Sequence, residues 1–152
     1  HNFMGNQVCA LLPAESYVYR VAYSFTAGDM PTIVLHPKGK ILSFWGQRDL
    51  TNLPVEADVI AFIKNLREFY VENKEFMCFG NMVKPLPYKT GEITFACDYG
   101  RTYTTEEVLT AAYSLDGATI QIFVNFNKED KQIQFQGETL TIKAFSVTKK
   151  EL

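Results

Sequence analysis

The residues best suited to binding chemistry in this sequence lie close together at Trp45, Gln47, Arg48 and Asp49. A sugar presents an apolar ring face together with a rim of hydroxyl groups. An aromatic side chain beside Arg, Gln and Asp matches both features, since the ring stacks and the polar groups bond the hydroxyls. We therefore interpret Trp45, Arg48 and Asp49 as substrate-binding candidates for a carbohydrate. A structural interpretation has at least as much weight, with Trp45 packed on the next helix and a solvated Arg48–Asp49 pair.

Other polar clusters give weaker indications of chemistry. Glu106 and Glu107 are adjacent, but successive side chains of a strand point to opposite faces, so we do not expect them to act as a carboxylate pair. Four tyrosines of the second half could form a carbohydrate-binding face, although Tyr in strands is more often packed. These are Tyr88, Tyr99, Tyr103 and Tyr113. The sequence has neither a nucleophile-elbow motif nor a phosphate-binding glycine loop. We predict no catalytic residue and no cofactor for this chain by itself.

Cysteine usage and charge narrow the classes of ligand. Cys9, Cys78 and Cys97 are far apart and form no CxxC pair, so we predict free buried thiols and no metal site. The formal net charge of −2 gives no basic field that favours nucleic acid. No apolar run approaches the roughly 18 residues of a membrane span. The first residues show no basic-then-apolar leader, and this leaves the compartment open.

An amphipathic helix is predicted within residues 53–82. Its apolar side chains recur at three- and four-residue spacing, and charged side chains fill the opposite side. The apolar set is Val59, Ile60, Phe62, Ile63, Leu66, Phe69 and Tyr70. The sequence before this helix indicates mixed helix and strand, whereas the sequence after it indicates strand almost throughout.

The segment before that helix resembles one half of a βα repeat. A helix is predicted to begin near Ser16 and to end at Gly28 as a C′ glycine. A short buried strand follows at residues 32–35, and a loop with Trp45 follows the strand. This order fits the last units of a βα barrel or the edge of a doubly wound sheet. Residues 1–7 look like the inside of a pocket-lining loop, so we expect the chain to start within something larger, unless His1 is left over from a tag.

Residues 84–87 contain two prolines and are predicted as an extended linker or edge strand. Beyond them, alternating strands with polar turns are typical of a small antiparallel sandwich, and Asp116–Gly117 is a strong hairpin signal. The predicted strands cover residues 92–98, 108–114, 118–126, 131–135 and 139–147.

These elements together resemble the C-terminal part of certain bacterial glycoside hydrolases, in which a (β/α)8 barrel precedes a C-terminal β-sandwich. Three stretches carry the likeness: residues 22–25 with 28–31, residues 66–70 through 79–82, and residues 111–117 with 122–126. The expected fold is therefore α+β, with terminal βα units of a barrel-like domain over residues 1–80 and a C-terminal β-sandwich over residues 81–152. A whole barrel needs roughly 250 residues, so this chain can hold only its last one or two units.

The resemblance also implies a role and further site residues. His1 and Asn2 would lie at the C-terminal end of a barrel strand, where barrel enzymes keep their sites, and we include them as substrate-binding candidates. Glycosidase chemistry needs two carboxylates about 5 to 10 Å apart, and most barrel strands that supply them are absent. We expect a structural, cleft-bordering segment that is inactive alone, with carbohydrate and the missing N-terminal part of the same enzyme as partners. The alternative is a free-standing carbohydrate- or protein-binding sandwich with a helical extension.

Overall fold

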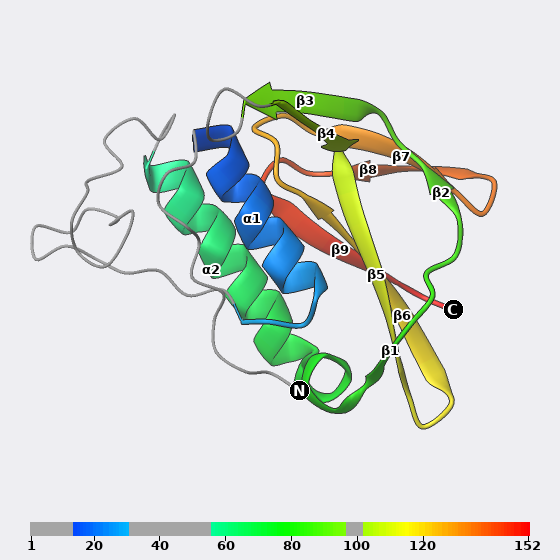
Figure 1. Cartoon of the computed structure of the whole chain (residues 1–152). Helices are drawn as coiled ribbons and strands as arrows, with labels where there is room; N and C mark the ends of the chain where they lie inside the picture. The colour runs from blue at the N-terminus through cyan, green and yellow to red at the C-terminus, as the bar shows by residue number, and fades with distance from the viewer. Residues whose placement is uncertain (1–13, 31–55, 97–101) are drawn as a thin grey trace, which may run out of the picture.

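The computed structural model describes residues 14–30, 56–96 and 102–152 (Figure 1). Two α-helices precede the β-strands in the chain, and every strand pairing in these segments is antiparallel. The predicted mixture of α and β structure with antiparallel strands is therefore confirmed. The strand predicted at residues 32–35 and the loop that carries Trp45 lie outside the described residues.

The helices are α1 (Ala14–Thr26) and α2 (Glu56–Glu72), followed by a short π-helical segment, η1 (Glu75–Phe79). The strands are β1 (Asn81–Val83), β2 (Tyr88–Lys89), β3 (Glu92–Ala96), β4 (Thr102–Glu106), β5 (Val108–Leu115), β6 (Ala118–Asn125), β7 (Lys131–Phe135), β8 (Glu138–Ile142) and β9 (Ser146–Glu151).

Helix α1 ends at the predicted glycine. Gly28 has a φ of 91°, in the left-handed region that glycine adopts without steric cost. Its N–H donates to the Phe25 carbonyl, and the Asp29 N–H donates to the Ser24 carbonyl, at 3.0 and 3.1 Å. This pair of bonds satisfies two carbonyls of the last turn in a Schellman motif.

The helix predicted within residues 53–82 is two elements followed by a short strand. After α2, the segment η1 widens the helix, and the Gly80 N–H donates to both Glu75 and Phe76 carbonyls at 3.1 and 3.0 Å. A Cβ atom at Gly80 would lie 2.4 Å from the Phe76 carbonyl oxygen, so only glycine fits this close approach. The chain leaves η1 at Gly80 in extended conformation and enters β1 directly.

The strands form three sheets. The largest has the order β1-β5-β6-β9, the second has the order β2-β7-β8, and β3 pairs with β4. Asp116 and Gly117 both have positive φ, as a two-residue hairpin turn requires, so the predicted hairpin between β5 and β6 is confirmed.

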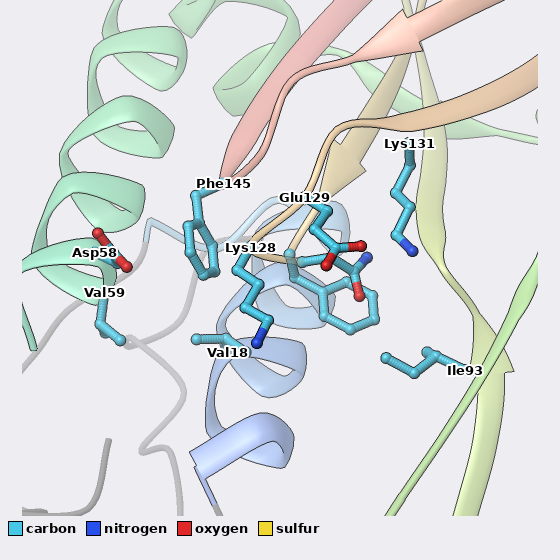
Figure 2. Close-up of a pocket in the computed structure, with 10 residues that line it drawn as sticks. Val18, Asp58, Val59, Ile93, Lys128, Glu129, Lys131 and Phe145 are labelled. Carbon is cyan, nitrogen blue, oxygen red and sulfur yellow. The ribbon is translucent and has the colours of Figure 1, made fainter. Parts of the chain in front are cut away.

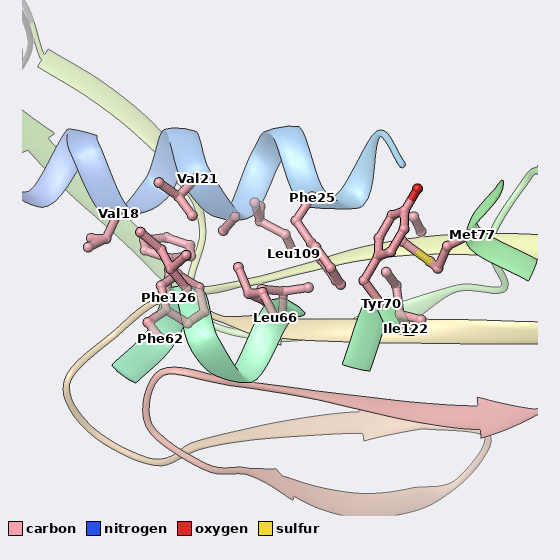
Figure 3. Close-up of a cluster of buried hydrophobic side chains, with 14 of the residues drawn as sticks. Val18, Val21, Phe25, Phe62, Leu66, Tyr70, Met77, Leu109, Ile122 and Phe126 are labelled. Atoms are coloured by element: carbon pink, nitrogen blue, oxygen red, sulfur yellow. The ribbon is translucent and has the colours of Figure 1, made fainter. Parts of the chain in front are cut away.

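One hydrophobic core joins the helices to the four-stranded sheet (Figure 3). Helix α1 supplies Val18, Val21, Ala22 and Phe25, and α2 supplies Val59, Phe62, Ile63, Leu66 and Tyr70. The sheet supplies Leu109, Ala111 and Tyr113 from β5 and Ile120, Ile122 and Val124 from β6. Among the described residues the predicted boundary at residue 80 therefore does not separate two cores.

The opposite face of the four-stranded sheet packs on the three-stranded sheet. A second cluster between them contains Val108, Phe123, Ile133, Phe135 and Ile142. Alternate residues of β6 belong to the two clusters, and this strand is buried on both faces. The described part of the chain is thus layered as helices, sheet and sheet (Figure 1).

Two strand predictions need correction. The strand predicted over residues 139–147 is two strands, β8 and β9, separated by a turn at residues 143–145. Strand β4 was not predicted, because its residues are mostly polar and exposed and lack the apolar alternation that marks a half-buried strand. Residues 84–87 form neither helix nor strand, in agreement with the predicted linker.

Candidate binding site

A cavity of about 480 Å³ lies where the start of α2, the middle of α1 and two turns of the sheets meet (Figure 2). It is lined by Val18, Asp58, Val59, Ile93, Phe126, Asn127, Lys128, Glu129, Lys131 and Phe145. Small-molecule sites have volumes of roughly 300 to 1,000 Å³ and combine apolar walls with a few polar groups. The cavity has both the size and the composition of such a site.

The floor and walls of the cavity are apolar. Val18 comes from α1, Val59 from α2 and Ile93 from β3, while Phe126 and Phe145 come from the turns after β6 and before β9. In Figure 2 the side chain of Lys128 extends from its turn toward Val18 of α1. The cavity is therefore built from segments that are far apart in the sequence.

The turn between β6 and β7 is held by buried amides. The Asn125 amide donates to the Glu129, Ile142 and Lys143 carbonyls at 2.8, 3.0 and 3.1 Å. Its oxygen accepts the Asn127 backbone N–H at 2.9 Å. Asn125 thereby joins the β6–β7 turn to the turn between β8 and β9, so both turns that line the cavity are fixed to each other.

Phe145 is held in an uncommon conformation beside the cavity. Its φ is 48°, in the left-handed region that bulky side chains rarely adopt. Its N–H donates to the Asn127 carbonyl at 3.1 Å, and its carbonyl accepts from the Asn65 amide at 3.0 Å. Its ring centroid lies 5.7 Å from that of Phe62. Bonds on both sides of the residue and ring packing together hold this conformation.

One cation of the cavity wall is already neutralised. Lys131 Nζ lies 2.6 Å from Glu107 Oε1, and both side chains are largely shielded from solvent. A Cβ atom at Gly91 would meet Glu107 Oε2 at 2.4 Å, which shows how closely the carboxylate packs there. Glu107 is thus a structural partner of Lys131, and Glu106 belongs to β4.

Three charged side chains of the rim have no such partner. Asp58, Lys128 and Glu129 are exposed, and their side chains form no hydrogen bond or ion pair with the residues that the structure describes. Two acceptor groups and one donor group therefore stand around an apolar floor.

The tyrosines proposed as a carbohydrate face have different roles. Tyr113 is buried and its hydroxyl donates to the Thr26 carbonyl at 2.6 Å, and Tyr88 donates to the Val108 carbonyl at 2.6 Å. Burial raises the pKa of both hydroxyls. For these two the packing interpretation is confirmed. Tyr103 is 44% exposed and its hydroxyl lies 3.2 Å from that of Tyr19, while Tyr99 lies outside the described residues.

All five site residues predicted from sequence, His1, Asn2, Trp45, Arg48 and Asp49, lie outside the described residues, and they stay predictions. The cavity residues were not predicted, because the stretch 127–130 has the composition of an ordinary polar turn. A signal that points to it is the pair of asparagines, with Asn125 at the end of a mostly apolar strand and Asn127 just beyond it.

Neither a metal centre nor a membrane-spanning helix is found within residues 14–30, 56–96 and 102–152. This part of the chain holds no group of three or more metal-ligating side chains. None of its helices is both long enough and apolar enough to cross a bilayer. Cys78 is a free, half-buried thiol whose sulfur lies 3.2 Å from the Tyr70 hydroxyl. Comparisons with protein-family models, curated proteins and solved structures find no match for this chain.

Proposed function

We propose that the chain is the C-terminal segment of a carbohydrate-active enzyme of the glycoside hydrolase type. In this proposal residues 1–80 are the terminal βα units of a (β/α)8 barrel, and residues 81–152 are a small C-terminal β-sandwich. The observation that carries it is the order of elements, in which two helices lead directly into antiparallel sheets through η1 and Gly80. The segment supports the barrel and borders its cleft, and it is inactive by itself.

Several apolar side chains of the helices are exposed, and their exposure supports the proposal that a further layer of protein covers them. Tyr23 of α1 is 56% exposed, and Ile60 and Val71 of α2 are 41% and 51% exposed. Ile60 and Val71 are eleven residues apart, about three helical turns, so they share one face of α2. Full burial of an exposed Val or Ile side chain stabilises a structure by about 1.5 to 3 kcal/mol, and the rest of a barrel would provide the part that these half-exposed side chains still lack.

The ionisable groups support a non-catalytic role. A glycosidase general acid has a raised pKa and stands about 5 to 10 Å from a second carboxylate. Glu107 is instead bound to Lys131, and hydrogen bonds from Lys143 and Ala144 lower the pKa of Asp130. These carboxylates organise turns of the sheets.

The test is a comparison of two proteins in an aryl-glycoside assay. One is this chain, and the other is a longer protein from the same reading frame with the residues upstream of His1. We expect turnover by the longer protein and none by the chain. Robust turnover by the chain alone, or a complete lack of turnover by a folded longer protein across a panel of aryl glycosides, would contradict the proposal.

A second candidate function is a free-standing carbohydrate- or protein-binding module. The observation that favours it is the shared core, in which the apolar side of α2 packs on the four-stranded sheet. Sedimentation of the purified chain separates the two candidates. The barrel proposal predicts association through the helices that weakens when Ile60 and Val71 are both replaced by Ser. A monomer at all concentrations favours the binding module.

A further inference from the structure

We propose that the cavity lined by Phe126, Phe145 and the β6–β7 turn is a saccharide-binding subsite. The proposal rests on described residues other than those predicted from sequence, and it does not depend on the barrel parentage proposed above. The argument rests on the shape, the rigidity and the charge of the cavity.

The shape fits a small ring compound. The cavity of about 480 Å³ is lined by aliphatic and aromatic side chains, while the charged side chains of Asp58, Lys128 and Glu129 are exposed to solvent. A pyranose has the matching distribution, because its C–H faces are apolar and its hydroxyl groups point outward around the ring. A purely apolar ligand would leave the three rim charges without partners.

The charge of the rim selects against anions. Lys131 is bound to Glu107, so among the described residues that line the cavity the charged groups free to meet a ligand are the carboxylates of Asp58 and Glu129 and the ammonium of Lys128. Their sum is one negative charge, which disfavours phosphate or a second carboxylate. Carboxylates accept hydrogen bonds from hydroxyl groups, and an ammonium donates to them. A neutral polyhydroxy ligand can use all three groups.

The site is also preorganised. Asn125 joins the two turns through its side-chain bonds. The Phe145 N–H donates to the Asn127 carbonyl, and the Phe145 carbonyl accepts from the Asn65 side-chain amide. A ligand that enters the cavity therefore orders few protein groups that are not already ordered. Preorganisation of this kind raises affinity by lowering the entropic cost of binding.

The test follows backbone amide shifts of the isotope-labelled chain during titration with methyl β-glucoside, maltose, cellobiose and lactose. We expect at least one of these sugars to cause saturable shifts at residues 126–131 and 143–146. Replacing Lys128 by Ala together with Glu129 by Gln should weaken that binding about tenfold, since charge-assisted hydrogen bonds to the ligand are lost. The same spectra show whether the variant is folded.

The matched control is the double substitution of Lys74→Ala with Glu75→Gln. These residues have the same types and spacing, are also exposed, and lie at the start of η1 outside the cavity lining. We expect no change in sugar binding.

Lack of saturable shifts with all four sugars would overturn the proposal, as would shifts confined to other residues or binding that survives the cavity variant. Saturation of the cavity by inorganic phosphate without any response to sugars would make it an anion site and would equally overturn it. None of these outcomes depends on whether a longer protein hydrolyses glycosides.

Discussion

At the scale of single residues, Gln121 of β6 shows how a polar side chain can be buried without a penalty in free energy. Gln121 is fully buried, and its amide accepts from the Leu86 N–H at 2.9 Å and donates to the Leu86 carbonyl at 3.1 Å. It also donates to Thr110 Oγ1 at 3.1 Å. These bonds attach the proline-containing linker between β1 and β2 to the sheet. A buried amide whose donor and acceptor atoms all have hydrogen-bond partners stabilises one specific arrangement of the chain around it.

Replacing Gln121 by Leu should destabilise the chain by about 1 to 3 kcal/mol, because the Leu86 N–H and carbonyl lose their partners. Chemical denaturation of the purified variant measures this change. The control is Gln134→Leu, on strand β7 of the three-stranded sheet, where the amide is exposed and bonds an exposed Thr139. We expect that control to change the free energy of unfolding by less than about 0.5 kcal/mol. Equal effects of the two substitutions would show that the buried bonds do not hold the linker.

The second residue-scale prediction concerns pH. Asp130 accepts from Lys143 Nζ at 2.7 Å and from the Ala144 N–H at 2.9 Å, and both bonds favour its charged form and lower its pKa. The stabilisation that these two bonds give to the turn is therefore complete at pH values above the ordinary pKa of Asp. It is lost as the pH falls through the lowered pKa.

We expect the exchange protection of the Ala144 amide to decrease in acid, after correction for the pH dependence of intrinsic exchange. Asp130→Asn should remove this pH dependence. A Glu138→Gln control, at the first residue of β8, should leave it unchanged. Protection of Ala144 that stays constant through the acid range would contradict the assignment.

At the scale of elements, α2 has one side that is buried in the core and another side that is exposed to solvent. Leu66 is fully buried against the sheet core, whereas Val71 on the same helix is 51% exposed. The periodicity of the sequence predicts the buried side correctly, because a helix must place an apolar stripe against some partner. The identity of that partner is not encoded in the periodicity. The stripe was assigned to no specific surface, and the structure packs it on α1 and β9, within the core to which β5 and β6 also contribute.

Leu66→Ala should lower the free energy of unfolding by about 2 to 5 kcal/mol, because it leaves a cavity in the core shared by helices and sheet. Val71→Ala deletes apolar atoms from the exposed side and should cost less than about 0.5 kcal/mol. Urea denaturation followed by circular dichroism measures both. A small effect of Leu66→Ala would mean that α2 does not pack on the sheet in solution.

Some ends of helices and strands could be predicted from the sequence and others could not, and each case has a physical reason. Gly28 and the pair Asp116–Gly117 have conformations that few other residues allow, so the helix end and the hairpin were predictable. The turn at residues 143–145 has no Gly, Pro or Asn, and Phe145 takes its positive φ from tertiary contacts. No local signal marks such a turn. The candidate cavity was missed for the same reason, since it forms only when distant turns and two helices meet.

At the scale of the whole molecule, the described residues form three layers with the four-stranded sheet in the middle (Figure 1). Strand β6 contributes to the clusters on both sides of this sheet, and Tyr113 of β5 bonds the end of α1. The helices and the sheets should therefore gain and lose their structure together, as one cooperative unit. The cavity depends on this unit, because its walls come from both helices, from strands β3 and β7 and from two turns.

Native-state hydrogen exchange across the whole chain tests this unity most directly. We predict that the best-protected amides of α2 near Leu66 and of β6 near Ile122 open with free energies that agree within about 1 kcal/mol. Exchange of the α2 amides through an opening several kcal/mol less costly than that of β6 would show that the helices detach from an intact sheet. That result would contradict the shared core and the cavity built upon it.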